Sequence, residues 1–303
     1  MAVYVVGDFL RETRLRKGYT QEEVSYGICT PASLSRIENG AQKPGRLILE
    51  KLFERLGTEN NLFNSFVSRE DMELYSAIQE LIRNITDDDV AKIEAQIEVV
   101  ERLAVNSSEL EHQCLYFAKG ELARQKEKDN EKAMEMYMKA IHITLPDFDG
   151  KNPLRNNLLT FDEIMIINSI AILYGNSENV ITAIQLDMWL KEYMENKIVD
   201  GKMKTTKYPM IMYNLSCWLE DKGCYREELR MAEQGIDFCV KYGNLALFPK
   251  LVLNKGGALV KMGDNENARK YLHQAITIFD AMGKLEIVQQ VTAWCKDNCE
   301  FEI

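Results

Sequence analysis

Residues 7–17 place Phe9, Leu10, Thr13 and Leu15 among charged residues, and Gly18 follows them. This pattern suits an amphipathic helix, and a glycine is a common helix stop. A second segment opens at Thr20, which stands three residues before Glu23. That is the spacing of a capping box, in which each side chain accepts a hydrogen bond from the other residue's backbone amide. The pattern predicts two short helices before the break at Gly27.

A third segment opens at Thr30 and ends before Gly40. Thr30 can cap this helix, and Pro31 suits its first position, where an amide hydrogen has no partner within the helix. Pro44 opens a fourth segment with a leucine-rich apolar face. The short turn at residues 27–29 gives the second and third helices the dimensions of a helix-turn-helix. The alternative is a generic helical hairpin.

Small residues recur forty residues apart in the C-terminal part of the chain. Three such residues have counterparts at that distance, which pair Ser216 with Gly256, Gly223 with Gly263, and Gly235 with Ala275. Small residues at these offsets let two antiparallel helices approach closely, as in a tetratricopeptide repeat. A third copy, with one extra residue in its turn, is marked by Tyr116, Gly120, Ala123, Ala133, Tyr137 and Ala140.

The rest of the C-terminal part also shows helical patterns. Residues 161–195 fit a fourth copy poorly, and residues 285–296 predict a closing helix. Stacked repeats form a superhelix whose concave surface is built from the first helix of each pair. The alternative is a set of unrelated amphipathic helix pairs.

The charge of the chain is unevenly distributed. A formal net charge of −10 argues against a nucleic-acid partner, since a DNA-binding protein must neutralise phosphates. Residues 1–57, however, hold nine Lys and Arg against seven Asp and Glu, a balance of +2, which leaves −12 for the remainder. For a chain of 303 residues, this asymmetry predicts two domains with different tasks.

The sequence contains no constellation that is typical of catalysis or metal binding. His112, His142 and His273 stand far apart, and the seven cysteines lack C-x-x-C spacing. Neither a phosphate-binding glycine loop nor a G-x-S-x-G motif is present. We therefore expect no enzymatic activity, no metal and no cofactor. The scattered cysteines, with neither a secretion leader nor a long apolar run, predict a soluble cytoplasmic protein with reduced thiols and no membrane partner.

The string TQEEVSYGICTPASLSRIENGAQKP, preceded by LRETRLRKG, resembles the Xre or Cro-repressor class of DNA-binding domains. The turn glycine, the cap, the Ser-Arg-Ile-Glu-x-Gly ending and the trailing proline all fall in order. The resemblance implies a DNA interface that comprises Gln21, Thr30, Ala32, Ser33, Arg36 and Lys43.

Within this interface, Gln21 matches a position that meets a phosphate, whereas Ala32, Ser33 and Arg36 match positions that face base edges. The first position of the recognition helix is often Gln in this class, but here it is Pro31, which has no side-chain donor for adenine. Base reading therefore rests on fewer residues, with Arg36 as the candidate for a guanine. A phosphate contact or a solvated surface arginine is the alternative for Arg36.

The same resemblance implies that Arg14 and Glu38 pair across the first and third helices and stabilise the domain. Together with the repeats, it predicts an all-α protein of two domains. We expect residues 1–66 to form an Xre/Cro-like helix-turn-helix domain and residues 67–303 to form a right-handed superhelix of tetratricopeptide-like helix pairs.

An Xre-type domain followed by such repeats resembles the RRNPP family of bacterial regulators, the PlcR and PrgX type, which bind short secreted pheromone peptides after import. The resemblance implies a cytosolic transcriptional regulator that binds a two-fold symmetric operator as a homodimer. The resemblance also implies that a short signalling peptide in the concave groove gates this regulator, as in quorum sensing. The alternative is a helical scaffold or adaptor that binds protein partners, with little DNA-binding role. A small-molecule sensor also stays open.

The repeat alignment places Asn214 and Asn254 at the same position of successive first helices, and Asn168 at a comparable one. The resemblance implies that this position lies on the concave side, where asparagines hold the backbone of a peptide. An amide side chain both donates and accepts hydrogen bonds, so a ladder of amides can hold an extended backbone of any sequence. Asparagines that cap turns or face water are the alternative.

Side chains near these asparagines are candidates for pockets that recognise the peptide. We expect Tyr174, Tyr213 and Lys250 to line such pockets. Lys250 or Arg124 can pair with a terminal carboxylate, since both carry a positive charge.

Overall fold

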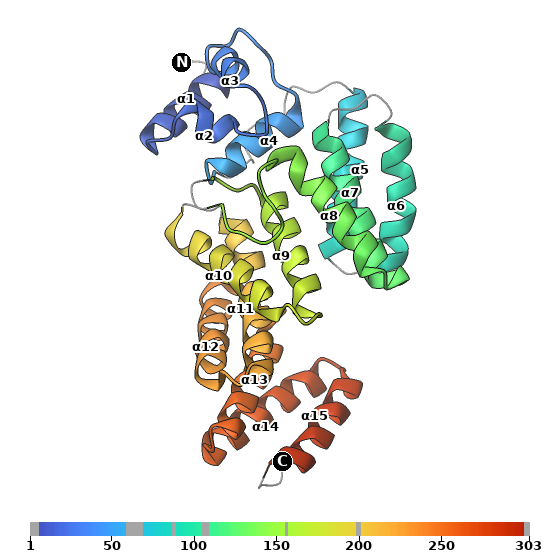
Figure 1. The fold of residues 1–303 in the computed structure, drawn as a ribbon, viewed down its shortest axis with the longest axis vertical. Helices are drawn as coiled ribbons and strands as arrows, with labels where there is room; N and C mark the ends of the chain where they lie inside the picture. Colours follow the sequence, from blue (N-terminus) through green and yellow to red (C-terminus); the bar gives the residue numbers. More distant parts are fainter. Residues whose placement is uncertain are drawn as a thin grey trace. The chain divides into compact units, whose positions relative to one another are not determined.

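The structure, a computed structural model, describes six stretches of the chain (Figure 1): residues 6–58, 69–86, 89–104, 109–154, 157–197 and 201–299. These stretches form helices and contain no strand, so the expected all-α class is confirmed. In the part described, none of the helices combines the length and apolar character needed to cross a membrane. The predicted boundary between residues 66 and 67 falls outside the described residues and stays a prediction.

The N-terminal part forms four short helices, α1 (Val6–Arg16), α2 (Gln21–Ser25), α3 (Pro31–Glu38) and α4 (Arg46–Arg55). The capping box is present: Thr20 Oγ1 accepts the Glu23 amide at 3.1 Å, and the Glu23 carboxylate accepts the Thr20 amide at 2.7 Å. Thr30 caps α3 by accepting the Ser33 amide at 3.1 Å, with Pro31 in the first turn. These local signals explain why both helices begin where they do.

Apolar side chains of these helices meet in one core. Helix α4 begins at Arg46, two residues after Pro44, with Gly45 as its N-cap. Two later residues, Leu110 and Leu158, pack into the same core, whose other buried members are Leu10, Val24, Ile28, Leu34, Ile37, Leu47, Leu52, Phe53 and Leu56. The N-terminal helices therefore share their core with residues from the repeat part.

The chain divides into two compact units, one that comprises Met1–Leu173 and Ile198–Gly201 and one that comprises Tyr174–Lys197 and Lys202–Ile303. Besides α1–α4, the first unit holds α5 (Arg69–Thr86), α6 (Val90–Leu103), α7 (Glu109–Leu122), α8 (Asn130–Thr144) and most of α9 (Phe161–Gly175). The second unit holds α10 (Val180–Asn196), α11 (Gly201–Asp221), α12 (Tyr225–Tyr242), α13 (Phe248–Lys261), α14 (Asn265–Ala281) and α15 (Leu285–Asn298). The first unit thus combines the N-terminal helices with the first helices of the repeat part.

The small residues of the repeat pattern lie where helices approach closely. A Cβ on Gly120 of α7 would lie 2.4 Å from the ring of Tyr137 on α8, and one on Gly256 of α13 would lie 2.7 Å from Leu272 Cγ on α14. These distances are shorter than van der Waals contact, so a larger residue would displace the facing side chain. In the copy marked by Tyr116 and Gly120, the extra residue of the turn coincides with a π-helical stretch, Ala123–Glu127.

Helices α9 and α10 occupy the segment that fits a fourth copy poorly. All residues of α9 from Glu163 to Ala171 are buried. A helix buried on all sides lacks the apolar stripe by which an amphipathic repeat is recognised, which explains the poor fit. The predicted closing helix is present as α15.

Candidate nucleic-acid interface and ligand groove

Helix α3 presents on its outer side the residues that the Xre resemblance assigns to base edges. Ala32 and Arg36 are exposed and Ser33 is half-buried, whereas Leu34 and Ile37 are buried in the core. Arg36 Nη2 donates to Ser33 Oγ at 3.3 Å, so the guanidinium lies beside the start of α3. The contact of Arg36 with a base stays a prediction.

The remaining predicted DNA contacts lie around this helix. Thr30 is exposed at the start of α3, and Lys43 is exposed between α3 and α4. Gln21, the first residue of α2, is half-buried, and its side-chain nitrogen donates to Glu38 Oε2 at 2.7 Å. An amide nitrogen carries two hydrogens, so one remains for the predicted phosphate contact.

The structure brings Arg14 and Glu38 together as a two-pronged ion pair. Arg14 Nε and Nη2 donate to the Glu38 carboxylate at 2.7 and 2.8 Å, and Arg14 Nη1 donates to the carbonyl of Tyr19 at 3.0 Å. Burial alone would raise the pKa of Glu38, but hydrogen bonds from Arg14 and Gln21 outweigh it and lower this pKa. The pair therefore joins α1 to the end of α3 as a charged bridge; its effect on stability stays a prediction.

Three of the nine basic residues counted in residues 1–57 are buried, which changes the charge argument. Arg14, Lys51 and Arg55 are 7, 3 and 2% exposed, and each pairs with a carboxylate inside the first unit. They cannot neutralise phosphates in this arrangement. The charge available to DNA lies instead on exposed residues of the N-terminal helices and their loops, among them Arg11, Arg16, Arg36 and Lys43.

Asn214 on α11 and Asn254 on α13 are half-buried and have partners within the second unit. Asn254 Nδ2 lies 2.7 Å from Ser216 Oγ and 3.3 Å from Cys217 Sγ, and Asn214 Nδ2 lies 3.4 Å from Asp187 Oδ2. Each amide nitrogen thus links its helix to a preceding one, so the side chains neither cap turns nor point only to water. Their contact with a peptide stays a prediction.

Two predicted pocket residues lie side by side, since Lys250 Nζ is 5.3 Å from the centre of the Tyr213 ring. Burial raises the pKa of Tyr213, which keeps its phenol neutral. A pocket of about 310 Å³ lies in the same unit and is lined by Glu220, Leu253, Asn254, Gly257, Gln290, Val291 and Trp294. Its volume suits a single large side chain of a ligand.

Three lining residues of this pocket, Glu220, Gln290 and Trp294, were not predicted from the sequence. Gln290 and Trp294 stand four residues apart on α15 and therefore share one face of that helix. This spacing is the signal that could have identified them, but it requires knowing that the closing helix lies beside α13.

The other predicted groove residues are placed differently. Asn168 and Arg124 belong to the first unit. Asn168 is 2% exposed, so the expectation that it lies on an open concave surface is wrong. Arg124 Nη2 pairs with Glu121 at 2.5 Å, which commits its guanidinium to an internal carboxylate. Tyr174, in the second unit, is half-buried at the end of α9.

Three family models match the chain. Residues 151–298 match the RNPP family C-terminal domain, residues 5–66 match a helix-turn-helix domain, and residues 115–144 match a tetratricopeptide repeat. The uncharacterised HTH-type transcriptional regulator YqaF of Bacillus subtilis (strain 168) is 38% identical over 63 residues, which are 20% of this chain and 83% of that protein.

Solved structures share the fold over nearly the whole length. PlcR of Bacillus thuringiensis, in complex with the peptide PapR7 and DNA, gives a TM-score of 0.62 at 19% identity and covers 95% of this chain and 98% of that chain. The apo form of the competence regulator ComR from Streptococcus vestibularis gives 0.53 at 15% identity, over 97% and 98% of the two chains. At these identities the likeness shows the fold alone.

The outward recognition helix, the repeat helices and the matched models define a helix-turn-helix transcriptional regulator with a C-terminal helical-repeat domain. The fold and the class that the sequence predicted are thereby confirmed. The C-terminal part of the chain, residues 151–298, therefore matches the family that is named RRNPP above.

Proposed function

We propose that this regulator binds a two-fold symmetric operator as a homodimer, and that a short signalling peptide in the groove of its repeats changes this binding. The protein then acts in the cytoplasm as the receptor of a quorum-sensing signal. PlcR, which shares the fold, was solved with both a peptide and DNA, and it is the precedent for the two partners.

The observation that carries the DNA-binding part is the outer face of α3. Its base-facing candidates point away from the core, while Leu34 and Ile37 hold the helix in place. Thr30 fixes the first turn of the helix, and the Arg14–Glu38 pair fixes its end. A recognition helix held rigidly at both ends loses little freedom when it enters a major groove, which favours specific binding.

The pocket beside Asn254 supports the peptide-binding part. Leu253, Val291 and Trp294 offer apolar walls, whereas Asn254, Gln290 and Glu220 offer polar groups. Ligand sites typically combine apolar walls with a few polar groups that fix orientation. We infer that one apolar side chain of the peptide enters this pocket and that the peptide backbone contacts Asn254.

Sequence-selective retention of DNA tests the DNA-binding part. Fragments tiled over the region beside the protein's own gene are compared with random fragments of equal length by fluorescence polarisation at one salt concentration. Specific sites bind about 10³–10⁷ times more tightly than random DNA, so at least one fragment should stand out. Arg36→Ala should reduce this preference, whereas Arg269→Ala, at an exposed position of α14, should preserve it. Equal retention of all fragments contradicts the proposal and favours the adaptor.

A further inference from the structure

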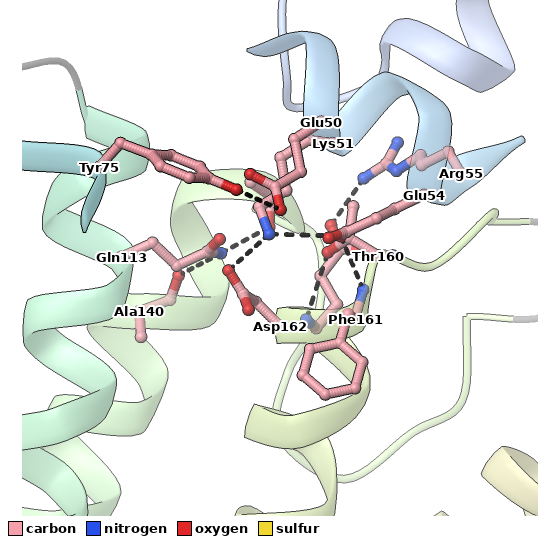
Figure 2. A network of polar contacts seen from close by, with 12 residues as sticks. Glu50, Lys51, Glu54, Arg55, Tyr75, Gln113, Ala140, Thr160, Phe161 and Asp162 are labelled. Atoms are coloured by element: carbon pink, nitrogen blue, oxygen red, sulfur yellow. Dashed lines mark hydrogen bonds and ion pairs between the residues drawn. The ribbon is translucent and has the colours of Figure 1, made fainter. Parts of the chain in front are cut away.

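A buried cluster of charged side chains joins α4 to the start of α9 inside the first unit (Figure 2). Lys51 is 3% exposed, and its Nζ lies 2.7 Å from Asp162 Oδ2 and 3.2 Å from Glu54 Oε2. Glu54 Oε2 also accepts the backbone amide of Phe161 at 3.0 Å. Glu50 lies on the same side of α4, where Tyr75 donates to its Oε1 at 3.4 Å. The DNA-binding helices are therefore docked on the repeat part through buried polar contacts.

A second ion pair beside this cluster is balanced in charge. Arg55 Nη2 lies 2.6 Å from Glu163 Oε1, and both side chains are fully buried. The Glu163 carboxylate also accepts the Thr160 amide at 2.6 Å, which caps the start of α9. One cation here meets one anion, so this pair needs no further charge.

The cluster around Lys51, by contrast, is not balanced in charge. Glu50, Glu54 and Asp162 bring three carboxylates, and the cations that face them are Lys51 and the half-buried Arg46. The other titratable groups packed against the cluster, Tyr75 on α5 and Cys114 on α7, are neutral because burial raises the pKa of each. Full ionisation therefore leaves one excess negative charge in a buried site, and Glu50 Oε2 has no hydrogen-bond partner among the described residues.

Carboxylates that share a desolvated site do not all ionise, because both burial and mutual repulsion favour the protonated form of at least one. One added proton makes the cluster neutral. We propose that the cluster holds this proton, mainly on Glu54, while the DNA-binding helices are docked on the repeat helices, and releases it when they separate. Docking, and with it the placement of the recognition helix, is then linked to pH.

The sign of the linkage follows from the two states of Glu54. In the docked state, burial is the largest cause that raises the pKa of Glu54 to about 7. An exposed glutamate titrates at about 4.3. The docked state binds the proton more tightly, so docking strengthens as pH falls below about 8 and weakens as pH rises through about 7. The docking equilibrium constant should be about tenfold larger at pH 6 than at pH 8.

The Phe161 amide reports this docking directly. Phe161 is the first residue of α9, where a backbone N–H has no acceptor within its own helix. Its acceptor is Glu54 of α4. The amide therefore becomes free to exchange with solvent when α4 leaves the start of α9.

The test uses the full-length chain labelled with ¹⁵N-phenylalanine and follows hydrogen exchange of the Phe161 amide by NMR at pH 6 and pH 8. Each rate is divided by the rate of an unprotected amide at the same pH. In the wild type, protection should be about tenfold higher at pH 6. In Glu54→Gln, whose neutral amide keeps the shape and the acceptor oxygen, protection should differ by less than about twofold. Glu80→Gln, at an exposed ion pair on α5, should keep the wild-type dependence.

Equal protection of Phe161 at both pH values in the wild type would overturn the proposal. The same tenfold dependence in Glu54→Gln would overturn it as well. If that variant does not fold, a carboxyl ¹³C titration of the wild type tests the proposal. A glutamate with a titration midpoint near pH 7 supports the proposal, and the absence of such a glutamate overturns it. None of these outcomes involves DNA or peptide, so they are independent of the proposed function.

Discussion

Removing the carboxylate of Glu38 should destabilise the DNA-binding helices selectively. The carboxylate accepts three hydrogen bonds, from Arg14 Nε at 2.7 Å, Arg14 Nη2 at 2.8 Å and Gln21 Nε2 at 2.7 Å. The Arg14 and Glu38 side chains are 9% and 1% exposed, so Glu38→Ala leaves a buried guanidinium behind. Breaking a buried pair from one side costs about 3–5 kcal/mol. Because Arg14 keeps the Tyr19 carbonyl as a partner, we expect about 3 kcal/mol.

Hydrogen exchange followed by mass spectrometry separates this local effect from global unfolding. In Glu38→Ala, helices α1–α3 should lose protection at a lower temperature than in the wild type, while α12–α14 keep theirs. Gln21→Ala, which removes one neutral donor and leaves the ion pair, should have a smaller effect. Since the pKa of Glu38 is lowered in the folded state, the stabilisation is present above about pH 4.3 and is lost as pH falls through the folded pKa. Equal protection of α1–α3 in Glu38→Ala and the wild type refutes this reasoning.

Three further predictions follow from the sites described. Arg36→Ala should weaken the free energy of operator binding by about 1–3 kcal/mol and relax selectivity at one base pair. If the affinities for operator and random DNA fall equally, and the slope of log affinity against log salt concentration shrinks by about one, Arg36 contacts a phosphate instead. Asn214→Ala and Asn254→Ala should each weaken peptide binding severalfold in a calorimetric titration, since each lost hydrogen bond costs about 1 kcal/mol; unchanged affinity in the double variant places the groove elsewhere. Gly256→Ala should destabilise the second unit by about 1–3 kcal/mol because the new Cβ meets Leu272. Gly257 has open space around it, so Gly257→Ala should stabilise the same unit by about 0.5–1 kcal/mol. Equal urea midpoints of unfolding for the two variants would exclude close packing at Gly256.

Local signals in the sequence were sufficient to predict the helices of the DNA-binding domain. Caps at Thr20 and Thr30 act over three residues, so neither depends on distant parts of the chain. The small residues of the repeats were equally informative, since Gly120 and Gly256 meet partners only 16 or 17 residues away, Tyr137 and Leu272. Periodicity and capping chemistry therefore predicted the helices, whereas the resemblance to the Xre class implied which residues of α3 face outward.

Contacts between distant residues could not be predicted in the same way. Lys51 and Arg55 were counted as charges available to DNA, but Arg55 pairs with Glu163, 108 residues further along the chain. Asn168 was placed at a position comparable to that of Asn214 and Asn254, but it is buried within α9 and does not lie on an open surface. In each case the environment of the side chain is set by tertiary packing, and no local pattern records that packing.

The effect of a peptide on operator affinity tests the central claim most directly. The wild-type chain is titrated onto an operator fragment at fixed salt and pH, with and without synthetic peptides that cover the C-terminal residues of short secreted reading frames beside the gene. The proposed function predicts that one of these peptides changes operator affinity by at least about fivefold, a coupling of about 1 kcal/mol, and that operator DNA changes the affinity for that peptide by the same factor. The account is contradicted if calorimetry shows that a peptide binds the chain and operator affinity is nevertheless unchanged by that peptide.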